Sequence, residues 1–171
     1  MELLIPGLLL VALMVYASTK IKKTAAEAFE PETIESGAFI LEKPEEFLNV
    51  VNRDPSLELD AYSREYGLEH AAEVRQARVE IRRFENSTLD EAIVIIKDSA
   101  TINSDIVEII GERKYRLVEA ERIEKGIGYR EIYKIAASGS TVYELKVIAL
   151  EDANEDVTRR IETILASFVV K

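Results

Sequence analysis

Carboxylates are the side chains in this sequence that could do acid–base or metal chemistry, because Asp and Glu together account for 32 of the 171 residues. Paired carboxylates can act as the acid and the base or nucleophile of a hydrolase, and Ca²⁺ prefers oxygen ligands. Adjacent acids occur at Glu45-Glu46, at Asp90-Glu91 and around Asp152. In a chain with this many acidic residues, such neighbours are expected by chance. Two of these sets also lie at the starts of expected helices, where they act as caps. We therefore assign no catalytic or metal-binding residue.

Histidine, cysteine and glycine-loop chemistry has little support in the sequence. His70 is the single histidine, and it lies beside Glu69 and close to Glu73, which indicates a surface position. The absence of cysteine excludes disulfides, thiolate nucleophiles and sulfur-ligated metals. The segment Gly126-Ile127-Gly128 lacks the third glycine of a nucleotide-binding loop and indicates a hairpin turn. We expect no cofactor.

Four tyrosines are the candidate partner-binding residues, and they lie on consecutive predicted strands: Tyr115, Tyr129, Tyr133 and Tyr143. Such side chains can line up across a sheet, where cross-strand packing is their default role. If the face that carries them is not wholly covered by helices, it becomes a binding surface, because aromatic rings with a polar tip suit interfaces.

The strands that would position these tyrosines are predicted over residues 106–110, 114–123, 129–136 and 141–150. Glycines separate the four segments, at Gly111, at Gly126 with Gly128, and at Gly139. Short connections of this kind favour hairpins between neighbouring strands. The C-terminal half is therefore predicted to be an antiparallel meander.

Two helices are predicted to cover one face of this meander. The first spans residues 88–98 and begins with a capping box formed by Ser87 and Asp90. The second follows a cap at residues 152–155. Its apolar positions form one stripe, made of Val157, Ile161, Ile164, Leu165 and Phe168. Strands packed by two helices give an α+β domain.

The N-terminal part of the domain is less regular. A short apolar strand is predicted at Ala38–Leu41, and alternating patterns predict two more strands at residues 57–61 and 77–82. Residues 47–51 and 66–73 fit either short helices or irregular structure, and the pattern does not separate these alternatives.

Residues 1–23 are predicted to be a transmembrane anchor. Leu3–Ala17 are almost all apolar, and the basic flank Lys20, Lys22 and Lys23 follows. The positive-inside rule keeps these lysines in the cytoplasm, so the N-terminus is expected outside and the folded domain inside. The alternative is a secretory signal cleaved after Ala17, although the basic flank lies on the wrong side for export.

Residues 24–36 are Ala- and Glu-rich and are predicted to be a tether, which leaves 37–171 as the folded domain. Residues 1–23 contribute +2 to the net charge of −10, so the remainder carries −12. Such a domain is repelled by nucleic acid and by anionic headgroups and attracted by basic partners. We expect no nucleic-acid partner.

Residues 77–169 resemble the PsbP-like family, which includes nuclear-import Ran-binding proteins and mycobacterial lipoproteins. The resemblance lies in the order and spacing of several short segments: residues 87–91 (STLDE), 112–117 (ERKYRL), a glycine turn, 142–145 (VYEL) and 164–168 (ILASF). It implies an antiparallel sheet flanked by helices. Residues 44–76 depart from the family pattern, which has a Gly-Trp-like element after the first proline where this chain has Glu45-Glu46-Phe47, and no binding residue is transferred.

Members of that family generally act as non-enzymatic binding or assembly modules, and the resemblance implies the same role here. Together with the anchor, it predicts a single-pass membrane protein that binds another membrane or membrane-associated protein. The first alternative is an exported domain that binds a small apolar ligand between sheet and helices. The second is a carboxylate-based hydrolase.

Overall fold

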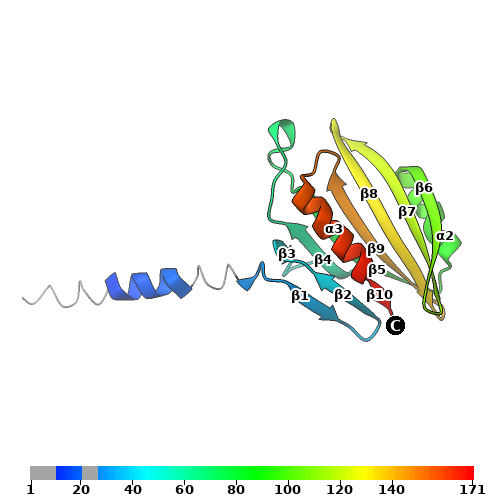
Figure 1. Cartoon of the computed structure of the whole chain (residues 1–171), viewed down its shortest axis with the longest axis horizontal. Helices are drawn as coiled ribbons and strands as arrows, with labels where there is room; N and C mark the ends of the chain where they lie inside the picture. The colour runs from blue at the N-terminus through cyan, green and yellow to red at the C-terminus, as the bar shows by residue number, and fades with distance from the viewer. Residues whose placement is uncertain (1–10, 21–26) are drawn as a thin grey trace, which may run out of the picture.

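The structure is a computed structural model, which describes residues 11–20 and 27–171 and shows an α+β domain built on a seven-stranded antiparallel sheet (Figure 1). In spatial order its strands are β3 (Phe47–Asn49), β4 (Leu57–Ser63), β5 (Ala77–Glu85), β9 (Thr141–Leu150), β8 (Ile127–Ser138), β7 (Arg113–Glu124) and β6 (Thr101–Ile110). A smaller sheet joins β1 (Glu32–Glu35), β2 (Phe39–Lys43) and β10 (Val169–Val170).

The predicted antiparallel meander is confirmed by β6, β7, β8 and β9, which pair in sequence order. The β7–β8 turn consists of Lys125 and Gly126, both with positive φ, at 53° and 82°. Two such residues match the right-handed twist of a hairpin, and glycine adopts this conformation without steric cost. The strands predicted at Ala38–Leu41, 57–61 and 77–82 are also present, as β2, β4 and β5.

Helix α3 (Glu155–Ser167) and helix α2 (Leu89–Ser99) lie on opposite faces of the large sheet, so the prediction that both cover one face is wrong (Figure 1). The predicted stripe of α3 packs on one face, against residues such as Leu145 and Val147 of β9. Ile93 and Ile96 of α2 pack against the other face of β7, β8 and β9. The sheet is buried on both faces here because its central strands are apolar at successive positions.

The caps of both helices are present. Thr88 and Glu91 form a complete capping box on α2, in which the Thr88 hydroxyl accepts from the Glu91 N–H. The predicted box of Ser87 and Asp90 is therefore wrong by one residue, because the glutamate side chain reaches the Thr88 N–H at 2.8 Å. Asn154, inside the predicted cap, accepts from the Val157 N–H and starts α3.

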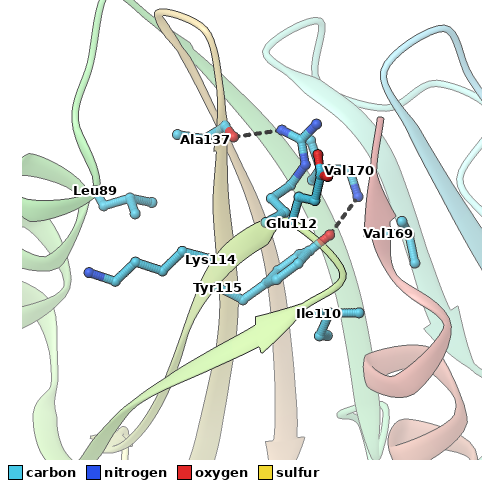
Figure 2. Close-up of a pocket in the computed structure, with 9 residues that line it drawn as sticks. Leu89, Ile110, Glu112, Lys114, Tyr115, Ala137, Val169 and Val170 are labelled. Atoms are coloured by element: carbon cyan, nitrogen blue, oxygen red, sulfur yellow. Dashed lines mark hydrogen bonds between the residues drawn. The ribbon is translucent and has the colours of Figure 1, made fainter.

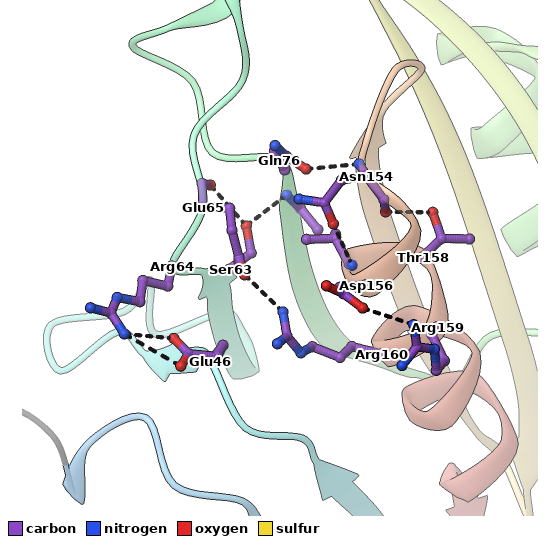
Figure 3. A network of polar contacts seen from close by, with 12 residues as sticks. Glu46, Ser63, Arg64, Glu65, Gln76, Asn154, Asp156, Thr158, Arg159 and Arg160 are labelled. Atoms are coloured by element: carbon purple, nitrogen blue, oxygen red, sulfur yellow. Dashed lines mark hydrogen bonds and ion pairs between the residues drawn. The ribbon is translucent and has the colours of Figure 1, made fainter.

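Polar contacts fix the first turns of α3 against β4 and β5 (Figure 3). The Gln76 side-chain oxygen accepts from the Asn154 N–H at 2.9 Å, and Arg160 pairs with Glu65 at 2.8 Å. Both anchors come from the connection between β4 and β5. These two contacts hold α3 across the sheet, with its apolar stripe facing the sheet.

The ordered domain begins earlier than predicted. Strand β1 lies inside the segment expected to be a tether, and it pairs with β2 from Glu32 to Glu35. The buried Lys43 ammonium donates to the carbonyls of Glu30 and Phe47, at 2.9 and 3.0 Å. These backbone partners join residues 30–35 to the domain. Residues 47–51 contain the short strand β3, and residues 66–73 contain a single 3₁₀ turn at Glu69–Ala71.

The predicted anchor falls mostly outside the described residues, as do Lys22 and Lys23. Residues 11–20 are helical and exposed, with Lys20 at their end. Within the portions of the chain that the structure describes, no helix combines the length and the apolar character needed to cross a membrane.

Candidate functional site

The four candidate tyrosines lie on two different faces of the large sheet and do not form one surface. Tyr115 and Tyr143 flank Ala136 in the sheet register and face α3. Tyr133 faces α2, and Tyr129 shares its face because both occupy odd positions of β8. Sequence spacing alone did not reveal this division, since the face of each tyrosine depends on the register between strands.

Three of these tyrosines are buried, with Tyr115 and Tyr133 exposed by 1% and 2%. The Tyr115 hydroxyl accepts from the Val170 N–H at 3.0 Å, which ties β7 to the C-terminal strand. Tyr129 is half-buried and lies 5.0 Å below the Arg122 guanidinium. Their environment is that of packed structural residues, and the default reading of cross-strand packing fits them better than a partner surface does.

A cluster of buried charges lies on the α2 side of the sheet. Glu131 is fully buried and accepts from Arg122 at 2.9 Å, and it also pairs with Lys146 at 3.2 Å and with the Tyr133 hydroxyl. Burial opposes ionisation of Glu131, but the Tyr133 hydrogen bond and the Lys146 and Arg122 charges outweigh it, so its pKa is lowered. Glu131 is therefore an ionised structural centre.

Glu144 lies in the same cluster, but its surroundings raise its pKa, whereas those of Glu131 lower it. Burial, together with the nearby Glu80 and Glu131 charges, raises its pKa to about 7 despite the attraction of Arg82 and Lys146. Neither Glu131 nor Glu144 lines the cavities described below. In the part of the chain that the structure covers, no group of three or more acidic or histidine side chains is arranged to hold a metal ion.

Strand β6 presents the most exposed apolar surface of the domain. It forms one edge of the large sheet and pairs with β7 alone among the described strands. Its four exposed large apolar side chains, which we call the β6 surface, are Ile106 (53% exposed), Val107 (48%), Ile109 (76%) and Ile110 (40%). Exposed apolar residues scattered singly are ordinary, but four of them on one edge strand make β6 a candidate interaction site.

A groove of about 610 Å³ continues the β6 surface at the β6–β7 hairpin (Figure 2). Ile110 and Val169 line one side of it, and Tyr115 forms its base. Arg113 donates to the Ala137 carbonyl at 2.7 Å, and this bond holds the hairpin against β8. The groove and the β6 surface together form a candidate docking site with free backbone groups along one side and apolar side chains on both faces.

Sequence reasoning treated Ile106–Ile110 as a strand but missed its exposure. Ile106-Val107 and Ile109-Ile110 break the alternation expected of a strand with one wet face. The sequence pattern therefore indicates burial on both faces and gives no sign of the exposure. The structure shows that β6 has no described neighbour on its outer side.

No family model matches the chain, and no curated protein is detectably similar to it. Several solved structures nevertheless share its fold. CyanoP, the PsbP protein of Synechocystis sp. PCC 6803, has a TM-score of 0.61 at 11% identity, covering 84% of this chain and 94% of that one. LpqN of Mycobacterium tuberculosis, which is involved in cell envelope biogenesis, has a TM-score of 0.58 at 8% identity, covering 83% and 91%.

A variant of the protein Mog1 is also similar, with a TM-score of 0.53 at 12% identity, and the match covers 82% of this chain and 96% of that one. At such identities the similarity concerns the fold alone. The PsbP-like fold is thereby confirmed. The match also extends over more of the chain than residues 77–169, where the sequence resemblance lies.

Proposed function

We propose that this chain is a membrane-anchored, non-enzymatic binding or assembly module that adds an extended segment of another membrane protein to β6 as a further strand. The observation that carries the proposal is the ten-residue edge strand β6, with four exposed apolar side chains and no described partner on its outer side. In strand addition the free backbone groups supply affinity, and the alternating side chains supply specificity.

The proposed partner segment alternates apolar and basic residues. Glu108 interrupts the apolar run of β6, Asp105 precedes that run and pairs with Arg116 of β7, and residues 24–171 carry a net charge of −12. A second copy of the chain fits this edge poorly. The antiparallel register that sets Ile106 against Ile110 and Val107 against Ile109 also places Glu108 opposite its own copy, and opposed like charges destabilise a strand pair.

The proposed membrane anchor acts through effective concentration. With residues 1–23 spanning the bilayer, N-terminus outside, the domain would stay beside a membrane-embedded partner on the cytoplasmic side. Confinement of this kind brings effective concentrations to about the millimolar range without any new contact. Lys20, Lys22 and Lys23 would each add about 1 kcal/mol of attraction to anionic lipid.

The strand-addition step is tested with a fluorescent peptide in which valine alternates with lysine. We expect it to bind the purified protein, and its glutamate counterpart to fail, as measured by fluorescence anisotropy. The double variant Val107→Lys, Ile109→Lys should weaken binding at least tenfold. The matched control is Val51→Lys, which changes an apolar residue of 92% exposure far from β6 in the sequence.

The result that would overturn this mechanism is equal binding of the peptide to the wild type and to the β6 double variant. Circular dichroism and the urea midpoint of each variant establish that the fold is retained. Sedimentation of the unliganded protein tests the competing occupant, since a dimer that the β6 substitutions dissolve would assign the edge to a second copy.

The membrane address is tested separately by carbonate extraction and by protease digestion of sealed cells. We expect an integral protein whose C-terminal domain is protected from external protease. N-terminal sequencing decides the alternative, since a mature chain starting at Ser18 would place the domain outside as an exported binding protein. Affinity capture should compare the full-length protein with a form starting at residue 27, because β1 and the Ala28 and Glu30 carbonyls that accept from Lys43 must be kept.

A further inference from the structure

A second cavity lies between α3 and the sheet, away from the β6 surface. It has a volume of about 270 Å³ and is bounded by β7, β8, β9 and one side of α3. Its apolar walls come from the sheet and from the helix: Leu117, Ile132, Leu150, Ile161 and Leu165. The volume is just under the range usual for small-molecule sites, and it suits a short alkyl group.

Small side chains explain why the helix leaves this space open. Ala149 and Ala153 border the cavity where larger residues would fill it, and Thr158 occupies the facing position on α3. The first turns of α3 are held by their polar bonds to Gln76 and Glu65, so the helix does not collapse onto the sheet. The cavity is therefore a consequence of both the residue sizes and the fixed position of the helix.

The mouth of the cavity is acidic. Glu119, Glu151 and Glu162 line it, together with a single cation, Arg130. Arg130 pairs with Glu119 at 3.3 Å, so the two other carboxylates give the mouth an excess negative charge. An anionic headgroup would be repelled there, whereas a cationic group would gain two counter-charges.

Glu151 is held at this mouth by the local backbone. Its N–H donates to the Gly128 carbonyl at 3.1 Å. Its carboxylate lies over Gly128, where a β-carbon would come within 2.3 Å of Oε2. Because residue 128 is a glycine, the Glu151 carboxylate has room to lie above it. The glycine beside the hairpin turn therefore allows Glu151 to place its charge at the cavity.

We infer that this cavity binds a small cationic amphiphile, with its alkyl part against Ile132 and Ile161 and its positive headgroup beside Glu151 and Glu162. The site is independent of the strand addition proposed for β6. It differs in ligand chemistry, since it takes a short apolar chain ending in a positive charge, while β6 takes an extended backbone. Apolar walls with a few charged groups at the mouth are the usual composition of a ligand site.

Three probes with the same alkyl chain test this inference: octyltrimethylammonium, octyl sulfate and octanol, each below its micelle concentration. Titrations are followed by isothermal calorimetry and by amide chemical shifts of the full chain in detergent-free nanodiscs. We expect the cation to bind most tightly, octanol more weakly and the sulfate not at all. Shift changes should concentrate on β7, β8, β9 and α3.

The double variant Glu151→Gln, Glu162→Gln should weaken binding of the cation about five- to tenfold and leave octanol binding unchanged. Glu155→Gln is the matched control, because it removes a charge from the same helix without lining the cavity. Ala153→Leu should block all three probes by filling the space.

Equal binding of the three probes, or no saturable binding of the cation, would overturn the inference. So would a double variant that binds the cation as tightly as the wild type does. The β6 double variant should bind octyltrimethylammonium normally, so failure of this site and failure of the strand-addition proposal are separate outcomes.

Discussion

The two edges of the large sheet are built in opposite ways. At one edge, β3 has three residues, and the chain's own N-terminal segment covers it, with the Glu46 N–H donating to the Phe29 carbonyl at 2.8 Å and Lys43 donating to the Phe47 carbonyl at 3.0 Å. At the other edge, β6 has ten residues and its outer side meets no described strand.

This difference separates a structural edge from an available one. Unpaired strand edges invite pairing with other chains, and proteins usually shorten, cover or charge them. The β3 edge is short and covered. The β6 edge is long and apolar, and Glu108 is the charged residue within its apolar run. The proposed binding role requires an edge of this kind. Glu108 disfavours pairing with a second copy of the chain, and the edge stays open to a basic strand.

The largest expected effect comes from breaking the closed edge at Phe47, whose side chain is 0% exposed. Phe47→Ala should lower the free energy of unfolding by about 3–5 kcal/mol, because it leaves a cavity in the core that β3 seals. Urea denaturation measures the change. A loss below about 1 kcal/mol would show that the β3 edge does not depend on this anchor.

Lys43 is the polar counterpart of that anchor. Its side chain is 4% exposed, and its ammonium donates to three backbone carbonyls, of Ala28, Glu30 and Phe47. Lys43→Met should cost about 3 kcal/mol, since the carbonyls lose a charged donor. Hydrogen exchange should also rise in β1 and β2. Unchanged exchange there would mean that strand pairing alone holds the N-terminal segment.

Between the two edges, the centre of the sheet contributes a pH dependence through Glu144. Its pKa is about 7 in the folded protein and 4.5 as an ordinary glutamate, so the folded state binds more protons in that interval and stability falls as pH rises through it. Relative to the wild type, Glu144→Gln should gain on the order of 2 kcal/mol between pH 5 and pH 8.5.

Urea denaturation at the two pH values measures this gain. Glu73→Gln is the matched control at an exposed position and should show no such difference. A parallel pH dependence of the wild type and of Glu144→Gln would place the titration elsewhere.

The smallest expected effect belongs to the open edge. Ile109→Thr should change the free energy of unfolding by less than about 0.5 kcal/mol, because the side chain is 76% exposed and packs against little. The same substitution should weaken binding of the valine–lysine peptide measurably. If it instead destabilised the domain as strongly as Phe47→Ala does, the β6 surface would be structural and the contrast between the two edges would disappear.

Local patterns predicted most of the elements correctly. The alternation in β4 and β5, the glycine turns of the meander and the stripe on α3 all depend on neighbours close in sequence. Errors arose where a one-residue choice mattered, as in the capping box at Thr88 and Glu91. The tether was also misjudged, since β1 lacks an apolar pattern and forms by pairing with β2.

The candidate site was predicted less well than the fold. The recurrence of tyrosines on consecutive strands suggests a shared surface, but the register sends Tyr115 and Tyr143 to one face and Tyr133 to the other. The apolar run of β6 was read as an ordinary strand. Its exposure depends on where the sheet ends, which no local pattern encodes.

By itself, the sequence determined the antiparallel order of the last four strands and the amphipathic stripe of α3, because the backbone period and the turn residues act over a few positions. Tertiary structure decided which face each helix covers, which strand ends the sheet, and that Glu144 lies among other charges in a buried layer. These properties arise from contacts between segments distant in the chain. Side-chain packing, strand register and the electrostatic environment of each residue are set only when those segments meet in the folded protein.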